Sequence, residues 1–553
     1  MNSTTGEQYL KEKLASAIEK IGISDSKVIE PQFERPKIAK HGDISSNVAM
    51  LLAAKLKQNP PEIANRLLVE MDLDSEIIQK AVVAGPGFIN FYFTNGYFRN
   101  SLKTILKQKE TFGCSDWGNQ KSVQFEFVSA NPTGPLNVVS ARAAAVGDVL
   151  ANLFNAVGFN TQKEFYVNDA GRQIRLLGRS VSARYMEILG RSEAFPEEGY
   201  HGDYIRDLAQ EIHNEYGEKF ASYDEQKRWE QLSNIALEKM LESHRDVLTA
   251  YRINFDTWFR ESELRKRNAH LEVLKTLSGK GYVFEKDGAK WFKSTEFGDE
   301  KDRVLITSEG EPTYFLVDVA YHVNKYGRKF ELLYDLWGPD HHGYIDRVKA
   351  ALVALGYPKG SFEVLTIQQV NLMEKGAVLK MSKRAGKIIE MEQLINEVGV
   401  DVARYFFVAR RIQSPLDFDM DLAKNTSEEN PVYYVQYAHA RICNIIKHAS
   451  ESGHKIPQEA NLNLLEKEEE IGLIKKLLEF PDLVSSAARF LEPHRLPNYL
   501  QELAASFHRF YHQHRVVTEN KDLTNARLIL VESTRVVLVN ALTLLGISAP
   551  ERM

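Results

Sequence analysis

The chain has 553 residues, 43% of them hydrophobic and 26% charged, and its formal net charge is −5 at pH 7. This composition is ordinary for a soluble globular protein, and the length suffices for roughly three or four domains that each bury a core. The negative charge excludes a general attraction of the whole chain to nucleic acid, so any RNA partner must be held by local basic patches.

The cysteines and the N-terminal sequence bear on the compartment. Cys114 and Cys443 are the only cysteines and lie far apart in the sequence, which argues against a disulfide framework or a zinc cluster and favours a reducing compartment. The opening "MNSTTGEQYLKEKLASAIEK" is polar and amphipathic rather than secretory, and we find no run of about 18 apolar residues that would span a membrane. We therefore expect a cytoplasmic enzyme without a membrane partner.

Residues 1 to about 110 alternate helical periods with short strands, such as "PGFINFYF" at 86–93. The segment "PKIAKHGDISSNVAMLLAAKL" is typical of an extended loop that leads into a helix. This pattern predicts an α+β domain over 1–110. The polar stretch 113–121, with "GCSDWGNQK", follows it as a linker.

From Ser122 onward, strands alternate with helices. The strands are expected in "SVQFEFVS", "QKEFYV", "KFELLYDLWG" and "FEVLTIQQVNL". This alternation predicts a mostly parallel, doubly wound α/β sheet over 120–424, with ligands at the carboxyl ends of its strands. A charged helical stretch at about 180–304 is too long for a loop and is predicted to be a helical insertion. Beyond about residue 425 long amphipathic helices predict an all-α bundle over 425–553.

The loop after the first of these strands reads "NPTGPLNVVS", from Asn131 to Ser140. Its prolines stiffen the backbone, and Gly134 permits close approach of another group. The helix that follows directs its free N–H groups toward the end of the sheet, where they suit a phosphate-bearing ligand. Taken alone, the loop is equally compatible with a plain strand-to-helix turn.

Two further loops carry polar or basic residues. Between Lys375 and Lys387 there are five basic residues and no acidic one, and the string Lys-Met-Ser-Lys favours a loop that neutralises a polyphosphate over an ordinary solvated basic loop. The second loop, "LWGPDHHGY" at 336–344, contains two adjacent histidines. These point apart, and no third ligand has suitable spacing, so ribose and adenine contacts are favoured over zinc.

Polar residues also fall near the expected strand ends and on one C-terminal helix. Buried carboxylates there would match a planar guanidinium in a bidentate way that lysine cannot copy, although each residue singly is also compatible with surface capping. The candidates are Glu126, Asn131, Tyr314, Asp318 and Gln368. The helical segment "FHRFYHQHRV" at 507–516 interleaves aromatic and basic residues, which suits an RNA loop but taken alone favours an ordinary amphipathic helix.

Together these strings resemble the class I aminoacyl-tRNA synthetases, and specifically the arginyl-tRNA synthetases of bacterial type. "FVSANPTGPL…SARAAAVGD" resembles the first signature region of that family and "KMSKRAG" the second. "YVNDAGRQI", "GYHGDYI", "STEFGDEKDRVL", "TYFLVDVAYHVNKY", "LWGPDHHGY" and "NPVYYVQYAHARI" resemble the stretches between and after them. "KHGDISSNVAM" and "AGPGFINF" resemble the N-terminal domain that reads the D-loop corner of the tRNA, and "GISAPERM" resembles the anticodon-binding end. The resemblance covers essentially the whole chain.

The resemblance implies a Rossmann-like doubly wound parallel sheet with an α+β N-terminal domain and an all-α C-terminal bundle. It also implies an arginine–tRNA ligase, in which ATP with Mg²⁺ and arginine give arginyl-adenylate and pyrophosphate before the arginyl group passes to tRNA(Arg). Adenylation of this kind depends on positioning and charge stabilisation. We expect a monomer without a prosthetic group or a resident metal.

The same resemblance implies roles for individual residues. The catalytic residues would be Lys380, Met381, Ser382 and Lys383. The ATP-binding residues would be Pro132, Thr133, Gly134, Pro135, Leu136, Asn137, Val138, Val139, Ser140, Gly338, Asp340 and His341. The arginine-binding residues would be Glu126, Ser129, Asn131, Tyr314, Asp318 and Gln368. The tRNA-binding residues would be Asn47, Tyr434, Arg441, His508, Arg509 and Met553.

One departure from the family lies at residues 137–140, where Asn-Val-Val-Ser replaces the usual His-Val-Gly-His. Asn137 and Ser140 still donate hydrogen bonds, but not as cations, and Val139 adds bulk where adenine would lie. Many family members lack the second lysine of Lys-Met-Ser-Lys and carry one before the first signature; here Gly134 and Lys383 form the converse, self-consistent arrangement. We therefore predict an active loop with weakened donors. The alternatives are a catalytically weakened tRNA-binding paralogue and a tRNA-independent nucleotidyl ligase.

Overall fold

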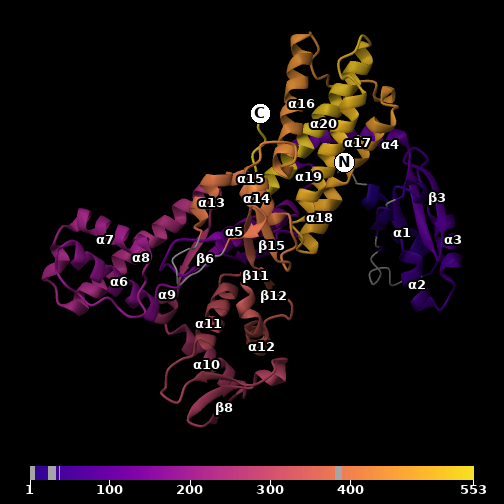
Figure 1. The fold of residues 1–553 in the computed structure, drawn as a ribbon. Helices are drawn as coiled ribbons and strands as arrows, with labels where there is room; N and C mark the ends of the chain where they lie inside the picture. The colour runs from indigo at the N-terminus through magenta and orange to yellow at the C-terminus, as the bar shows by residue number, and fades with distance from the viewer. Residues whose placement is uncertain (1–5, 23–30, 32, 37, 380–388) are drawn as a thin grey trace.

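The computed structural model describes residues 6–22, 31, 33–36, 38–379 and 389–553. Figure 1 shows a central sheet region, a helical arm, a small lower unit, a helical bundle and a separate N-terminal unit. These parts confirm the α/β class I architecture with an α+β N-terminal unit and an all-α C-terminal region.

The N-terminal unit packs four helices with a four-stranded antiparallel sheet of order β1-β2-β4-β3. Alternate residues of β4, including Ile89 and Phe91, are buried against helix residues such as Leu10 and Leu14. The helices are α1 (Gly6–Lys20), α2 (Val48–Leu56), α3 (Pro60–Glu70) and α4 (Asn95–Gln108), and the strands are β1 (Phe33–Glu34), β2 (Ile44–Ser46), β3 (Ile78–Ala84) and β4 (Phe88–Phe93). Short 3₁₀ turns are η2 (Ala39–His41) and η3 (Lys109–Thr111).

The central sheet has five strands in the order β12-β11-β5-β6-β7, and every neighbouring pair is parallel. The strands are β5 (Ser122–Glu126), β6 (Asn160–Val167), β7 (Thr257–Arg260), β11 (Leu332–Trp337) and β12 (Phe362–Thr366). Helices α5 (Val138–Ala156), α11 (Tyr314–Gly327) and α12 (Ile345–Leu355) connect or precede them. The chain runs outward from β5 in one direction and from β11 in the other, so the strand order reverses between β5 and β11. In open parallel sheets the ligand crevice lies at such a switch point.

The segment "FEVLTIQQVNL" forms two strands rather than the single one expected. β12 ends at Thr366, and β13 (Val370–Glu374) belongs to a second sheet with β14 (Ala377–Val378) and β15 (Leu416–Asp419). The break at Gln368 and Gln369 is held by Arg142 of α5, whose guanidinium donates to both of their carbonyls at 2.9 and 3.4 Å. A buried side chain distant in sequence therefore ends the first strand.

The stretch 180–304 is also not a purely helical insertion. Helices α6 (Arg172–Ile188), α7 (Asp203–Tyr216) and α8 (Glu225–Ala250), with the turn η4 (Lys219–Ser222), form an arm with its own core (Figure 1). The chain then returns to the main sheet as β7. It continues through α9 (Glu261–Lys266), α10 (Ala269–Gly279) and an antiparallel sheet of β8 (Val283–Lys286), β9 (Ala289–Phe292) and β10 (Arg303–Ile306), with η5 (Ser294–Phe297) between the last two. Strands of only four residues, set among charged residues, are too short for an alternating apolar pattern to be recognised in the sequence.

The described C-terminal part is helical from α13 onward apart from β15, so helices begin before the residue 425 at which the sequence predicts the bundle. Its helices are α13 (Met391–Val398), α14 (Val400–Val408), α15 (Met420–Lys424), α16 (Pro431–Glu451), α17 (Glu468–Leu478), α18 (Phe480–Arg489), α19 (Arg495–Gln513) and α20 (Lys521–Leu545), with the turn η8 (Leu462–Leu464). The Asn430 side chain accepts from Val432 N, and Pro431 occupies the first turn, which together fix the start of α16.

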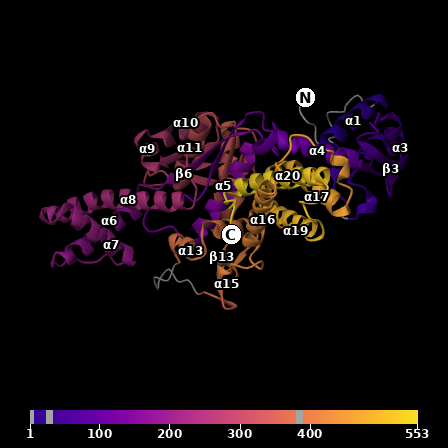
Figure 2. The ribbon, with the colours of Figure 1, turned by 90° about the horizontal axis from the view of Figure 1, so that it is seen from above.

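Among the described helices, α20 meets the length and composition criteria for a membrane span, although charged residues interrupt it and it is not an unbroken apolar run. An 18-residue stretch of it has a mean hydropathy of 1.8. However, 67% of that stretch is buried inside the structure. Figure 2 shows α20 running among α16, α17 and α19, so its apolar character matches a core position.

The N-terminal unit, one side of the main sheet and the C-terminal bundle share a continuous hydrophobic core. The N-terminal unit also contacts the bundle through ion pairs: Arg35 lies 2.5 Å from Asp482, and Lys475 lies 2.6 Å from Asp43. Removal of the C-terminal helices would therefore expose apolar surface on α5 and α14 instead of leaving an intact catalytic part. Tests of the bundle require point substitutions.

Arg404 of α14 is the fully buried cation that joins these parts. Its guanidinium donates to the carbonyls of Leu545 at 2.8 Å and Tyr251 at 3.1 Å, and it pairs with Asp148 of α5. Asp148 is also bonded by Lys163 of β6 at 2.9 Å. One guanidinium thus connects α5, α14, the end of α8 and the end of α20.

Arg404→Met should destabilise the protein strongly, because the substitution leaves two carbonyls unbonded and removes one of two cations beside a buried carboxylate. Breaking a buried ion pair costs about 3–5 kcal/mol, and we expect about 3 kcal/mol since Lys163 remains. The midpoint of urea unfolding, followed by circular dichroism, measures this loss. The matched control is Arg410→Met at an exposed position, expected to change stability by about 0.5 kcal/mol or less. Equal midpoints for the two variants would contradict the assigned role.

Candidate active site

Three acidic residues lie side by side near the carboxyl ends of three adjacent strands. Asp335 of β11 is paired in register with Glu126 of β5, and Glu126 is paired with Glu164 of β6. Residues paired in this way project to the same face of a parallel sheet. Their side chains are buried, with exposed fractions of 1%, 7% and 0%. A row of carboxylates with little access to water requires nearby cations and donors.

Helix α11 supplies those cations and donors. Lys325 lies 2.6 Å from Glu126 and 2.8 Å from Asp335, and Arg328 makes a two-pronged pair with Glu164. The Tyr321 hydroxyl lies 2.8 Å from Glu126 and 2.5 Å from Glu164, and His322 lies 2.9 Å from Asp335. We call these seven residues the buried charge cluster: Glu126, Glu164, Tyr321, His322, Lys325, Arg328 and Asp335. It fixes α11 across the switch point of the sheet.

The cluster shifts the pKa values of its members in opposite directions. Burial raises the pKa of Glu126, and Lys325 beside it opposes that shift. Burial acts in the same sense on Asp335, but Lys325 and His322 outweigh it and hold the pKa of Asp335 below its usual value. The nearby carboxylates raise the pKa of Lys325 against its desolvation. The lysine is therefore a permanent ammonium.

The residues predicted to bind arginine divide into internal and accessible groups. Glu126 is internal, because one of its oxygens faces Lys325 and Tyr321 while the other accepts from Ser129 at 3.0 Å. Asp318 and Tyr314 are accessible: 26% of the Asp318 side chain and 74% of Tyr314 are exposed. Both lie on the first turns of α11 at a spacing of four, and so on one helix face. Asp318 lies next to His322 of the cluster, and Tyr314 stands one turn earlier on the same face of α11.

Asn131 and Gln368 lie on the loops that flank these groups. Asn131 is exposed, and its carbonyl accepts from Thr133 N at 2.8 Å. Gln368 is half-buried directly after β12, with its backbone held by Arg142 and by the carbonyl of Ile412. Both therefore stand at strand ends, as the sequence predicts for ligand-binding loops.

Tyr166 of β6 belongs to the same region but was not singled out from the sequence. The carboxylates of Glu261, Asp318 and Glu126 and the loss of solvent all raise the pKa of its hydroxyl. Its backbone N–H donates to the Ser129 hydroxyl at 3.0 Å, and its ring packs on Tyr321 with centroids 4.5 Å apart. The string "FYVND" contained the signal, since a tyrosine near the end of a central strand faces the crevice.

The backbone between β5 and the following loop is strained. Val128 and Ser129 have φ values of +68° and +39°, in the left-handed region that a β-branched residue such as Val128 adopts only at a cost. This conformation turns the chain sharply, and the Ser129 hydroxyl then bonds both Glu126 and Tyr166 N. Strain of this kind is typical of functional loops held by their surroundings.

The loop 131–140 begins the helix α5 through Asn137. The carboxamide oxygen of Asn137 accepts from Val139 N at 2.9 Å and from Ser140 N at 3.1 Å, so this side chain caps the helix. Val139 is 41% exposed and is not packed into the protein. Pro132, Thr133, Leu136 and Val138 are buried and support the loop from below. The helix N-terminus therefore stands open beside Val139, with two of its amides bonded to Asn137.

The helical arm holds this loop from the other side. Tyr204 of α7 donates its hydroxyl proton to the Thr133 carbonyl at 2.8 Å, and His244 Nε2 lies 2.8 Å from the Gly134 carbonyl. Burial lowers the pKa of His244, which keeps the ring neutral with its proton on Nε2. A side chain on Gly134 would meet the Tyr204 hydroxyl at 3.2 Å. Sequence reasoning missed these contacts because 71 and 110 residues separate the partners.

The predicted catalytic residues Lys380, Met381, Ser382 and Lys383 lie outside the described residues. The chain on either side of them is well anchored. Leu379 N donates to Leu372 O at 2.8 Å, Met391 N donates to Leu136 O at 2.8 Å, and Glu390 forms a bridge with Asn137. The chain therefore rejoins the described structure directly beside the start of α5.

The loop after β11 forms the turn η6 (Pro339–Tyr344). Gly338 is half-buried and Asp340 is exposed, while the side chain of His341 is outside the described part of the structure. The Tyr344 hydroxyl has a raised pKa because of its burial and its contact with Asp318. The turn thus directly follows β11 and touches the accessible carboxylate of α11.

Aromatic and basic residues predicted to bind tRNA come together on the bundle. The rings of Tyr434 and His508 lie 4.9 Å apart, which joins α16 to α19. Arg441 donates to the Tyr437 hydroxyl at 2.5 Å and stands 4.6 Å from the centroid of that ring. Arg509 is exposed beside them. Aromatic rings and arginines gathered on one surface are suited to contacts with nucleotides.

The chain terminus and the N-terminal unit place the other two predicted tRNA-binding residues. Gln436 Nε2 donates to the Ser548 carbonyl at 3.0 Å, and His439 Nδ1 lies 2.9 Å from the Pro550 carbonyl, so the tail runs along α16. Met553 at its end is 48% exposed. Asn47 precedes α2 and is half-buried.

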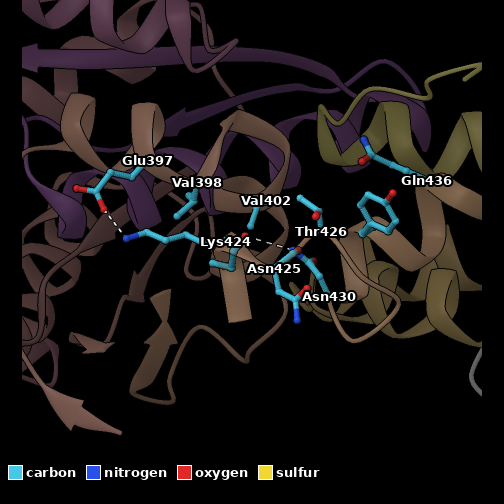
Figure 3. Close-up of a pocket in the computed structure, with 10 residues that line it drawn as sticks. Glu397, Val398, Val402, Lys424, Asn425, Thr426, Asn430 and Gln436 are labelled. Carbon is cyan, nitrogen blue, oxygen red and sulfur yellow. Dashed lines mark hydrogen bonds and ion pairs between the residues drawn. The ribbon is translucent and has the colours of Figure 1, made fainter. Parts of the chain in front are cut away.

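A cavity of about 210 Å³ lies away from the strand ends, between α13, α14, α15 and the start of α16. Figure 3 shows its lining residues, with Lys424 pointing to Glu397 at 3.0 Å. Its walls include Val402, Asn430 and Gln436. None of the predicted site residues lines it, so the candidate active site is the switch-point crevice and not this cavity.

Three family models match the chain in succession. They are the arginyl tRNA synthetase N terminal domain over residues 8–93, the catalytic domain of tRNA synthetases class I (R) over 101–411, and the DALR anticodon binding domain over 435–553. The order agrees with the N-terminal unit, the central sheet region and the helical bundle described above.

Relatives with known names match over almost the full length. The chain is 46% identical over 547 residues to an arginine–tRNA ligase of Listeria monocytogenes, covering 99% of this chain and 98% of that protein. An arginine–tRNA ligase of Bacillus pumilus is also 46% identical over 547 residues, at 98% coverage of each chain. The fold is similar to that of Thermus thermophilus arginyl-tRNA synthetase, with a TM-score of 0.79 at 23% identity and 99% coverage of both chains.

Proposed function

The chain belongs to the arginyl-tRNA synthetase family and is an arginine–tRNA ligase, and we propose that both of its half-reactions occur in the switch-point crevice between β5 and β11. ATP and arginine form arginyl-adenylate there, and the arginyl group then passes to tRNA(Arg). The observation that supports this location most directly is the accessible Asp318 carboxylate on α11, held over the buried charge cluster at the end of the sheet. The weakened-paralogue alternative has no support among the matching relatives.

We propose that Asp318 binds the guanidinium of arginine and that Tyr314 covers the aliphatic stem. A carboxylate at the end of a half-buried crevice accepts two parallel N–H bonds from a guanidinium, which the single ammonium of lysine cannot copy. Tyr166 and Gln368 complete the set, because their polar groups lie at the ends of β6 and β12. Glu126 and Ser129 act indirectly. Glu126 is bonded to Lys325, and the Ser129 hydroxyl holds Tyr166 in place by accepting from its backbone N–H.

For the ATP side, we propose that the loop 132–140 and the turn at 338–341 hold adenine, ribose and the phosphates. In adenylation a carboxylate oxygen of arginine attacks the α-phosphorus, and pyrophosphate leaves with its Mg²⁺ as part of the substrate. Asn137 uses its oxygen as a helix cap, so its NH₂ group is the donor left for the nucleotide. The positive end of α5 and the loop lysines supply charge stabilisation that imidazoles provide in the usual family sequence.

Lys380 and Lys383 are proposed to neutralise the charge that gathers on pyrophosphate as it departs. The support is the position of Glu390 and Met391, which bring the chain back to Leu136 and Asn137 at the start of α5. Lysine at both 380 and 383 supplies the cations within the loop itself. Glycine at 134 agrees with this arrangement, because no further lysine is then required before the first signature. We further propose that the protein acts as a monomer in the cytoplasm, and its two cysteines, which form no disulfide with each other, agree with a reducing compartment.

Asp318→Asn tests the arginine site, because the change keeps the shape and removes the charge. Losing a charge-assisted hydrogen bond pair should raise KM for arginine by about 10- to 100-fold in ATP–pyrophosphate exchange, measured with and without tRNA. The wild type should exchange far less with lysine or citrulline than with arginine. The control Asp246→Asn alters an exposed carboxylate of α8 and should leave KM unchanged. Citrulline activated as well as arginine would refute a charge-based arginine site.

Lys383→Ala tests the basic loop. The loss of one well-placed charge donor in the transition state typically costs about 10²–10³ in rate, and we expect that loss in single-turnover formation of arginyl-adenylate. Lys359→Ala, at an exposed position before β12, is the matched control and should keep the wild-type rate. A rate for Lys383→Ala within about threefold of the wild type would show that the lysine has no such role.

Arg441→Ala tests the tRNA surface of the bundle. Removal of one phosphate or base contact should weaken tRNA(Arg) binding by about tenfold and reduce the slope of affinity against salt by about one. Filter binding over a range of salt concentrations gives both values. The control Lys275→Ala lies on α10, which Figure 1 places in the lower unit far from the bundle, and should bind tRNA normally. Unchanged affinity in Arg441→Ala would remove this residue from the tRNA surface.

A further inference from the structure

His322 is fully buried in α11 between two oxygen acceptors. Its Nδ1 atom lies 2.8 Å from the carbonyl oxygen of Asp318 and 3.5 Å from a carboxylate oxygen of the same residue. Its Nε2 atom lies 2.9 Å from a carboxylate oxygen of Asp335. The ring also packs edge-on against Phe362 of β12, with centroids 4.6 Å apart. The side chain therefore links the backbone of the first turns of α11, at the Asp318 carbonyl, to Asp335 of β11, and it lies within ion-pair distance of the Asp318 carboxylate.

Two acceptors on opposite sides of one imidazole decide its protonation. A neutral imidazole donates from one nitrogen and accepts at the other, so one of these contacts would set a lone pair against an oxygen. Only the imidazolium donates from both nitrogens. The pKa of His322 agrees with this reading, since Asp318 and Asp335 together raise it against the effects of burial and of Lys325.

The charged groups around the ring come from every element that packs on it. Helix α11 itself provides Asp318 and Lys325, and strand β11 provides Asp335. Strand β12 contributes only the Phe362 ring, and Glu126 of β5 acts through Lys325. With Asp318 included, the region holds four carboxylates and three basic side chains: Asp318, Glu126, Glu164 and Asp335 against His322, Lys325 and Arg328.

We propose that His322 is a positioning residue for arginine recognition, which as an imidazolium ties Asp318 to Asp335 and so fixes the first turns of α11 for the substrate guanidinium. The inference rests on the proposed role of Asp318 in binding arginine. Without the second ring proton, the contact with either the Asp318 carbonyl or the Asp335 carboxylate becomes repulsive, and the turn of α11 that carries Asp318 loses its hold on β11. His322 itself does not touch the substrate.

The direction of the pH dependence follows from the sign of the shift. A histidine whose pKa is raised in the folded protein is protonated at and above its ordinary titration range, and it loses the proton only when the pH exceeds the raised value. KM for arginine should therefore rise with pH in that higher range, while KM for ATP should not follow. Arginine also titrates at its α-amino group there, so the profile must be tied to the enzyme by substitution.

The test compares three variants of the full-length enzyme in ATP–pyrophosphate exchange between pH 6.5 and 9.5. His322→Gln keeps one donor and one acceptor and should raise KM for arginine about tenfold, the loss expected for one charge-assisted hydrogen bond, with kcat and KM for ATP nearly unchanged. Asp335→Asn weakens the hold on the ring proton and should shift the rise in KM for arginine to lower pH. His448→Gln, on the exposed face of α16, is the matched control and should behave as the wild type.

A spectroscopic measurement checks the proton directly. In ¹⁵N-histidine-labelled wild type at pH 7, the His322 ring should show both nitrogens protonated, and that signal should be absent in His322→Gln. If His322→Gln fails to fold, Asp335→Asn identifies the ring, because its signal should change to the singly protonated form at a lower pH than in the wild type. A His322 ring with a single proton at pH 7 overturns the proposal.

The outcomes separate this inference from the proposed arginine site. If Asp318→Asn raises KM for arginine while His322→Gln does not, the positioning role of His322 is wrong and the arginine site stands. If Asp318→Asn leaves KM for arginine unchanged, the arginine site is wrong at that residue. A pH profile that does not move in Asp335→Asn assigns the titration to the substrate and overturns the role of His322.

Discussion

The arrangement of this protein depends on three carboxylates that the main sheet brings together out of contact with solvent. Asp335, Glu126 and Glu164 stand in register on adjacent parallel strands, and none of them is more than 7% exposed. Their burial would be strongly unfavourable without matching cations. Lys325 of α11 and Arg328, the residue that caps the C-terminus of α11, provide these. The electrostatic requirement of the sheet therefore fixes the position of one helix, and that helix presents Asp318 and Tyr314 at the crevice.

A similar dependence links the nucleotide side of the crevice to the helical arm. The backbone after β5 takes a strained turn at Val128 and Ser129, and the next loop packs its own buried side chains beneath it. Tyr204 and His244 bond the carbonyls of Thr133 and Gly134 from the arm, while Asn137 caps α5. The arm thus has a structural role in the site besides any contact with tRNA. Because glycine stands at 134, the loop fits closely under the Tyr204 ring.

The same continuous core that stabilises the protein also couples its RNA-facing surfaces to the crevice. Arg404 joins α5, which begins at Asn137, to the end of α20 in the bundle. Arg142, also on α5, holds the chain at Gln368 and at Arg411. Movement of the bundle would therefore act on α5, whose N-terminus belongs to the proposed nucleotide site. Rigid contacts of this kind give a physical route between tRNA binding and activation.

The sequence by itself determined the order of the parts, the parallel sheet, the C-terminal bundle and the family, because long periodic segments and extended motif strings carry those signals locally. It also marked Asp318, Tyr314 and the aromatic residues of α16 and α19. Only the tertiary structure decided that Glu126 faces Lys325, 199 residues away, and that Asn137 caps a helix with its oxygen. It likewise decided that 257–306 contains four short strands, whose four residues each give no usable period. Pairing across a sheet and between distant helices depends on which carboxylate meets which cation after folding. A single sequence contains no information about distances between residues that are far apart in the chain.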